Sequence, residues 1–154
     1  MSDDTVLFQA EQVQDLGFPG DPRVRQFWDP SPMDAQAFEL GLRQALEEAV
    51  EHPERFDTNA AQSESRARFV STEAEKILEH LGGYRRQVFG IVVDGEQRLY
   101  VSFLPGADWD SYGDSFEDWK ERTIAVSDGG FWFWSIQFTP STGEYQVLDS
   151  HGYA

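Results

Sequence analysis

The spacing of hydrophobic residues predicts two helices in the first half of the chain. Ser31 is followed by Pro32 and then by Asp34, which gives a hydroxyl N-cap, a proline at the first helical position and an acid at the third. From there apolar residues recur every three or four positions until Pro53 ends the pattern. The apolar members of this stripe are Phe38, Leu42, Ala45, Leu46 and Ala49.

A second stripe with helical spacing runs up to Gly82 and Gly83, and such a glycine pair is typical of a helix C-terminus. We place the start of this helix between Thr58 and Ser63. The two predicted helices together occupy residues 32–82. The apolar members of the second stripe are Ala67, Val70, Ala74, Ile77, Leu78 and Leu81.

From Tyr84 onward hydrophobic residues alternate with polar or small ones, which indicates β-strands. Two such runs flank Asp94-Gly95, a dipeptide that favours a two-residue hairpin turn. A two-residue turn would put the two apolar runs on opposite faces of the sheet. Because we expect them to share one buried face, we predict a three-residue loop over residues 94–96, with Ile91 beside Leu99. The two runs are Phe89, Ile91 and Val93, and then Leu99, Val101 and Phe103.

Further strands are predicted over residues 123–126, 131–139 and 145–150. Glycine-containing turns at 128–130 and 140–143 connect them. The middle strand of the three is aromatic and apolar on both sides. We assign Trp132, Trp134, Ile136 and Phe138 to its helix-facing side, and we assign Phe131, Phe133, Val147, His151 and Tyr153 to an aromatic patch on the opposite side.

These elements predict an α+β fold, with two N-terminal helices packed on one face of a curved antiparallel meander sheet of four to five strands. At 154 residues the chain has the size of a single domain. Residues 84–154 would form the sheet. Residues 1–31 contain short apolar pieces and prolines without a sustained period, so we expect an irregular arm that covers the aromatic patch.

The charge of the chain narrows the classes of partner. Twenty-eight Asp and Glu residues against twelve Lys and Arg residues give a formal net charge of −16, which argues against binding to nucleic acid or to an anionic membrane. A basic protein partner or a divalent cation fits this charge better. The chain has no cysteine, no membrane-length apolar run and no signal-peptide pattern, so we expect a cytoplasmic protein.

No motif commits the chain to a reaction. Residues 149–151 have the types of a catalytic triad, but adjacent strand residues point to opposite faces and cannot form the contact between nucleophile and base. Residues 108–114 are similar to a calcium loop, yet Tyr112 and Trp119 stand where oxygen ligands belong. The three histidines lack the spacing of a zinc site. We therefore predict no catalytic residues, no metal and no cofactor.

Two acidic segments, residues 34–57 and 106–121, lead to the functional prediction. Acidic patches accelerate association with cationic surfaces, and aromatic side chains among the acids act as anchors. We predict a non-enzymatic, acidic protein-binding domain, most concretely an immunity or inhibitor protein that neutralises a basic partner such as a toxin. The predicted partner-binding residues are Asp108, Trp109, Asp110, Tyr112, Asp114, Phe116, Glu117 and Trp119.

Two other functions stay open on the sequence alone. One is a small-molecule-binding or enzymatic protein with a pocket between helices and sheet, lined by Trp132, Trp134 and Tyr100. The other is a self-associating structural protein, such as a homodimer, that uses an aromatic face. The residues of that face are Phe131, Phe133, His151 and Tyr153.

The last third of the chain combines Asp128-Gly129-Gly130, an aromatic strand, Thr142-Gly143-Glu144 and the ending His151-Gly152-Tyr153-Ala154. In these motifs it resembles a loose group of small uncharacterised bacterial α+β proteins, whose members end in N-G-x-A. The resemblance implies a C-terminal hairpin, and no function comes with it.

Overall fold

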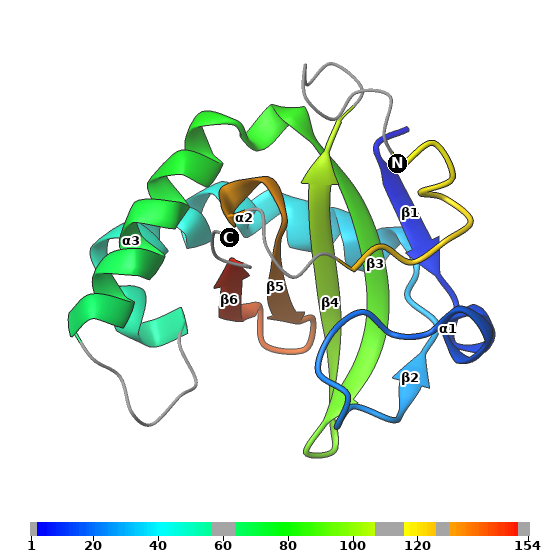
Figure 1. Cartoon of the computed structure of the whole chain (residues 1–154). Coiled ribbons are helices and arrows are strands. Elements are labelled where there is room, and N and C mark those ends of the chain that lie inside the picture. The colour runs from blue at the N-terminus through cyan, green and yellow to red at the C-terminus, as the bar shows by residue number, and fades with distance from the viewer. Residues whose placement is uncertain (1–2, 57–63, 107–115, 126–129, 151–154) are drawn as a thin grey trace.

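The computed structural model of the chain describes residues 3–56, 64–106, 116–125 and 130–150 (Figure 1). In chain order the elements are β1 (Thr5–Phe8), α1 (Ala10–Leu16), β2 (Phe27–Trp28), α2 (Pro32–Glu51), η1 (Pro53–Phe56), α3 (Glu64–Glu79), η2 (Leu81–Gly83), β3 (Tyr84–Val93), β4 (Glu96–Pro105), η3 (Gly130–Trp132), β5 (Trp134–Thr139) and β6 (Glu144–Ser150), where η marks a 3₁₀ helix.

The strands form one mixed sheet in the order β1-β3-β4-β5-β6, and β2 also pairs with β3. Strands β3 to β6 are the antiparallel meander that the sequence predicts. β1 runs parallel to β3 and pairs with its first half, whereas β2 runs antiparallel to β3 and pairs further along it. The α+β prediction is confirmed, and the N-terminal segment adds two strands to the sheet.

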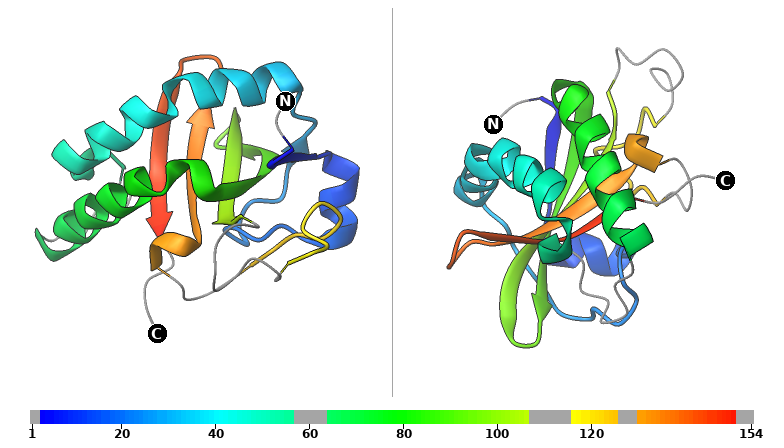
Figure 2. Two further views of the ribbon diagram at one scale, coloured as in Figure 1. Left: turned by 90° about the horizontal axis from the view of Figure 1, so that it is seen from above. Right: turned by 90° about the vertical axis from the view of Figure 1, so that its left-hand side faces the viewer.

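Helices α2 and α3 lie side by side over one face of the sheet, as predicted (Figure 2). α2 begins as its sequence indicates, because the Ser31 hydroxyl accepts a hydrogen bond from the Asp34 N–H and the Asp34 carboxylate accepts one from the Ser31 N–H at 2.8 Å. The helix ends before Pro53. Fully buried side chains of this helix-facing core include Phe38, Leu42, Leu46, Ile77, Tyr84, Phe103 and Trp134.

The turn between β3 and β4 shows that the predicted three-residue loop is wrong. Asp94 and Gly95 form a two-residue turn with φ angles of 52° and 78°, which is the geometry that Asp-Gly favours in hairpins. Gly90 therefore pairs with Leu99, and the two apolar runs face opposite sides of the sheet. The prediction assumed one buried face, whereas both faces of this hairpin are covered.

The N-terminal segment covers the second face of the hairpin, and it is not irregular. It forms β1, α1 and β2, and most of its apolar side chains pack on those β3 and β4 side chains that point away from α2 and α3. Leu7 and Trp28 instead pack against the helix-facing core. Phe8 stacks on Phe89 with ring centroids 5.1 Å apart, and Phe18 meets Tyr100 edge-on at 4.9 Å. The segment thus covers a different part of the sheet from the patch on which we placed it.

The C-terminal hairpin follows the prediction at its turn and departs from it at the start of β5 and within β6. Gly143 has a φ of 76°, as expected for the turn at 140–143. β5 begins only at Trp134, because the residues before it form the 3₁₀ helix η3. β6 contains a bulge at Val147, where φ is 55°.

The strand predicted over residues 123–126 is not found in its described part. Residues 123–125 are not a strand, and residue 126 lies outside the described residues.

Trp28 packs closely on the β3–β4 hairpin at Gly90. Its indole N–H donates to the carbonyl oxygens of Ile91 at 2.9 Å and Arg98 at 3.1 Å. A Cβ atom at Gly90 would collide with the carbonyl oxygen and the ring of Trp28. The missing side chain at Gly90 is therefore what lets β2 and its tryptophan approach the sheet.

We predict that Gly90→Ala lowers the free energy of unfolding by about 1–3 kcal/mol, the usual cost of overpacking. Gly82→Ala is the matched control, because a Cβ atom there would meet nothing within 4 Å. Urea unfolding of both variants measures the difference. Equal stabilities would contradict the close contact between β2 and β3.

Candidate functional site

The predicted partner-binding segment falls largely outside the described residues. Asp108, Trp109, Asp110, Tyr112 and Asp114 all belong to the range 107–115, which the structure does not describe. Glu117 is exposed and Phe116 is half-buried. Trp119 is only 7% exposed and packs in a cluster with Ile124 and Phe133. Trp119 is therefore a core residue, which leaves it little surface to offer a partner.

A buried amide on β3 holds this segment against the sheet. Gln87 is 0% exposed, and its Nε2 donates to the carbonyl oxygens of Trp119 and Arg122, both at 2.7 Å. Its Oε1 accepts a hydrogen bond from the Ile124 N–H at 3.0 Å. Gln87 was not singled out in the sequence analysis. The only feature in the sequence that could have identified it is a polar residue within a strand that is apolar on both faces.

The structure separates the aromatic residues of the alternative face. Phe131 lies in η3 and packs against the helix-facing core, where its ring stacks on His80 at 5.3 Å. Phe133 belongs to a different cluster, is 5% exposed and contacts Phe116 at 5.6 Å. The 3₁₀ helix η3 interrupts the strand alternation that placed Phe131 and Phe133 together. The other two residues of that face, His151 and Tyr153, lie outside the described residues.

Core side chains fill the region where we predicted a pocket between helices and sheet. Trp134 is 0% exposed and stacks on Phe103 at 3.8 Å. Tyr100 lies on the opposite face of the sheet, in the cluster covered by the N-terminal segment. Trp132 packs against the cluster of Phe133. Trp132, Trp134 and Tyr100 therefore do not line one cavity.

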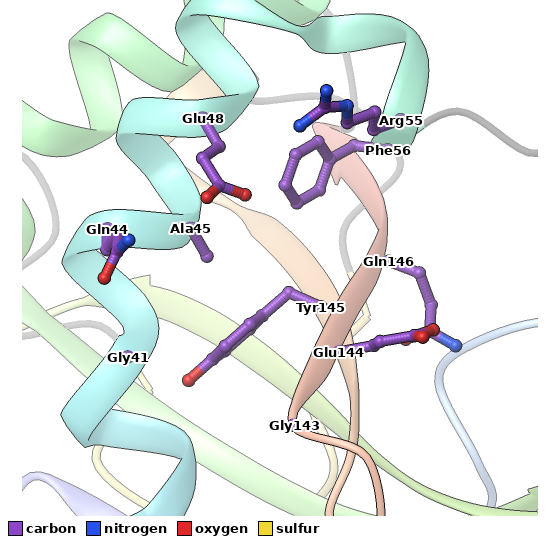
Figure 3. Close-up of a pocket in the computed structure, with 10 residues that line it drawn as sticks. All are labelled: Gly41, Gln44, Ala45, Glu48, Arg55, Phe56, Gly143, Glu144, Tyr145 and Gln146. Carbon is purple, nitrogen blue, oxygen red and sulfur yellow. The ribbon is translucent and has the colours of Figure 1, made fainter.

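A cavity of about 530 Å³ lies between α2, η1 and the start of β6 (Figure 3). We call it the α2–β6 groove. In Figure 3 the rings of Phe56 and Tyr145 lie between α2 and β6, and the carboxylate of Glu48 extends from α2 toward them. Arg55 lies beside Phe56 at the η1 end. The lining residues are Gly41, Gln44, Ala45, Glu48, Arg55, Phe56, Gly143, Glu144, Tyr145 and Gln146.

Tyr145 reaches α2 because Gly41 has no side chain. A Cβ atom at Gly41 would lie 2.7 Å from the Tyr145 hydroxyl oxygen and 3.2 Å from its ring. The hydroxyl donates a hydrogen bond to the carbonyl oxygen of Phe38 at 2.5 Å, and the ring lies 4.7 Å from that of Phe138. A glycine inside a helix costs about 1 kcal/mol, and here it permits the contact that fixes the floor of the groove.

The acidic residues beside the groove carry charges without a partner in the described part of the chain. Glu47, Glu48 and Glu51 are exposed on α2, and their carboxylates make no ion pair or hydrogen bond with any described residue. The guanidinium of Arg55 is exposed and makes no ion pair with the described part of the chain either. Glu39, in contrast, is held by Arg86 at 2.6 Å. The last two turns of α2 therefore present negative charge that no described residue neutralises.

The solvent side of α2 also carries exposed hydrophobic side chains. Leu40 is 90% exposed and Met33 is 78% exposed, which makes them the two most exposed large hydrophobic residues in the described ranges. Met33, Leu40 and Glu47 are seven residues apart in turn, so they form one row along the helix. Gln44 and Glu51 lie on the same side. We call the row of Met33, Leu40, Gln44, Glu47 and Glu51 the α2 outer face.

Burial raises the pKa of Tyr145 to about 12, with the backbone of Gly41 acting against this rise and the Glu39 carboxylate adding to it. The phenol is therefore neutral at physiological pH. Its hydroxyl can keep donating to Phe38, and the ring adds no negative charge to the groove.

This pKa predicts how Tyr145 affects stability at high pH. The folded-state pKa of about 12 lies above the ordinary value of 10.0, so the contribution of Tyr145 is fully present below pH 10 and is lost as the pH rises toward 12. Below pH 10 we expect Tyr145→Phe to be less stable than wild type, because the variant lacks the hydrogen bond to Phe38. The difference between the two free energies of unfolding should narrow toward pH 12. Urea unfolding across this pH range measures the difference in stability between wild type and variant. A difference that stays constant with pH would contradict the raised pKa.

Two structural searches of the described residues gave negative results. None of the described helices has the length and apolar character needed to cross a membrane. In the described ranges, no three or more His, Asp or Glu side chains are grouped as metal ligands would be. The calcium-like segment 108–114 is outside those ranges.

Comparison with known proteins gives no relative from which a function could be transferred. No protein-family model matches the chain, and no curated protein or solved structure shows significant similarity to it.

Proposed function

We propose that this protein binds a basic protein through the α2 outer face and the adjoining groove. The observation that carries the proposal is that Leu40, at 90% exposure, lies in one row with the carboxylates of Glu47 and Glu51, which pair with no described residue. An exposed apolar side chain supplies contact area that is favourable to bury, and the carboxylates that follow it along the row favour a partner of the opposite charge. Arg43 is the one basic residue of α2.

The overall charge supports the same kind of partner. A net charge of −16 on 154 residues attracts cationic proteins and raises their association rate. An anionic partner would be repelled. The most concrete form of the proposal is an inhibitor, such as an immunity protein that covers the cationic surface of a toxin.

The α2 outer face takes the role that sequence reasoning gave to residues 108–119. Of that segment's aromatic residues, Trp119 belongs to the core and Phe116 packs on Phe133. The other two, Trp109 and Tyr112, lie outside the described residues. Leu40 and Met33, in contrast, have most of their surface in solvent. Replacing them leaves the core intact, so their contribution to binding can be measured without loss of the fold.

The test begins with affinity capture from a lysate of the source organism at low salt, followed by reconstitution with the purified basic partner. We expect Glu47→Gln/Glu51→Gln to weaken binding by about tenfold or more, because two interfacial charge pairs are lost. Leu40→Gln should weaken it to a similar degree through lost contact area. Calorimetry at two salt concentrations measures the affinity and its dependence on ionic strength.

The matched control is Glu11→Gln/Asp15→Asn, which changes the net charge by the same amount at exposed positions on α1. This control should retain nearly all of the affinity. An equal loss in both double variants would show that only the net charge matters. That result, or the absence of any basic partner that stays bound at about 0.15 M salt, would contradict the proposal.

A further inference from the structure

The α2–β6 groove has the volume of a small-ligand pocket and so has room for an inserted side chain. Its volume of about 530 Å³ falls within the range of about 300–1,000 Å³ that is usual for ligand pockets. Phe56 is only 3% exposed and closes the end near η1, while Tyr145 forms the floor. The groove is continuous with the α2 outer face because Gln44 belongs to both.

The polar groups of the groove favour a cationic ligand. The Glu48 carboxylate extends into the groove and has no partner among the described residues. Glu47 and Glu51 on the same helix, together with Glu144 at the mouth, add negative charge around it. Among the described residues of the lining, Arg55 alone is a cation.

The aromatic rings favour a guanidinium over an ammonium group. A guanidinium is planar and weakly hydrated, so it stacks on aromatic rings and can still form two parallel hydrogen bonds with a carboxylate. The groove places the rings of Tyr145 and Phe56 near the Glu48 carboxylate (Figure 3). The Tyr145 hydroxyl is already bonded to Phe38, which leaves the ring as its binding surface.

We infer that the α2–β6 groove receives an arginine side chain of the basic partner, with the guanidinium on Glu48 and its plane against Tyr145. This inference rests on the proposed function and names the group that the partner inserts. Arg55 opposes the incoming charge from the η1 end of the groove. Removal of Arg55 should therefore strengthen binding, whereas removal of Glu48 should weaken it.

The test titrates the isotope-labelled full chain with N-acetyl-arginine amide and follows backbone amide shifts by NMR. We expect saturable shifts at Gly41, Tyr145 and Gln146. N-acetyl-citrulline amide, which has the same shape without the charge, should bind about tenfold more weakly. Equal binding of the two probes, or shifts confined to other elements, would overturn the inference.

Three variants test the assigned contacts. Glu48→Gln should weaken binding of the arginine probe by about fivefold or more, and Arg55→Gln should strengthen it. The remote control Glu11→Gln should leave the affinity for the probe unchanged. Free L-arginine, which adds a carboxylate, should bind no better than the blocked probe. Tighter binding of free L-arginine that depends on Arg55 would show a site for a zwitterionic small molecule and would overturn the inference.

The probe titration does not need the partner, so the two proposals fail in distinguishable ways. If the groove does not bind the arginine probe but the protein still captures a basic partner through the α2 outer face, only the arginine site is overturned. If the groove binds the probe but the protein captures no basic partner, the proposed function is overturned. In the reconstituted complex, Glu48→Gln should weaken partner binding more than Glu11→Gln does, and an equal effect would overturn the arginine site.

Discussion

Burial of both faces of the β3–β4 hairpin is the constraint on which the rest of the structure depends. The tight turn at Asp94 and Gly95 sets a register that sends one apolar run toward α2 and α3 and the other toward the N-terminal segment. Because each run needs its own cover, β1, α1 and β2 become necessary parts of the fold. Gly90 and Gln87 then hold the covering segments in place through close backbone approach and buried hydrogen bonds.

Local signals predicted the elements that depend on neighbours in sequence. The capping residues of α2, the proline that ends it and the left-handed glycine of the last turn all appear where their physical roles require them. For the register of β3 with β4 two signals disagreed: the local Asp-Gly turn, and a pattern argument that depends on whether a distant segment covers the second face. The Asp-Gly turn preference was the better guide there, and the assumption of a single buried face was the error.

For the candidate site, too, the sequence predicts local features but not those that depend on contacts between distant residues. The acidic character of α2 is visible in the sequence, and so is its amphipathic pattern. The groove is not visible, because it arises where Gly41 on α2 meets Tyr145 on β6, two residues that are far apart in the chain. Trp119 could not be recognised as a core residue either, since its burial depends on the hydrogen bonds that Gln87 makes across the sheet.

The acidic and apolar surface of α2 is the part of the molecule to which we assign function. Hydrogen–deuterium exchange of the protein, alone and in complex with its purified basic partner, tests this assignment most directly. We predict that protection on binding appears in α2, in η1 and at the start of β6, where the outer face and the groove lie. Protection confined to residues 116–125 or to α1, with no change in α2, would contradict it.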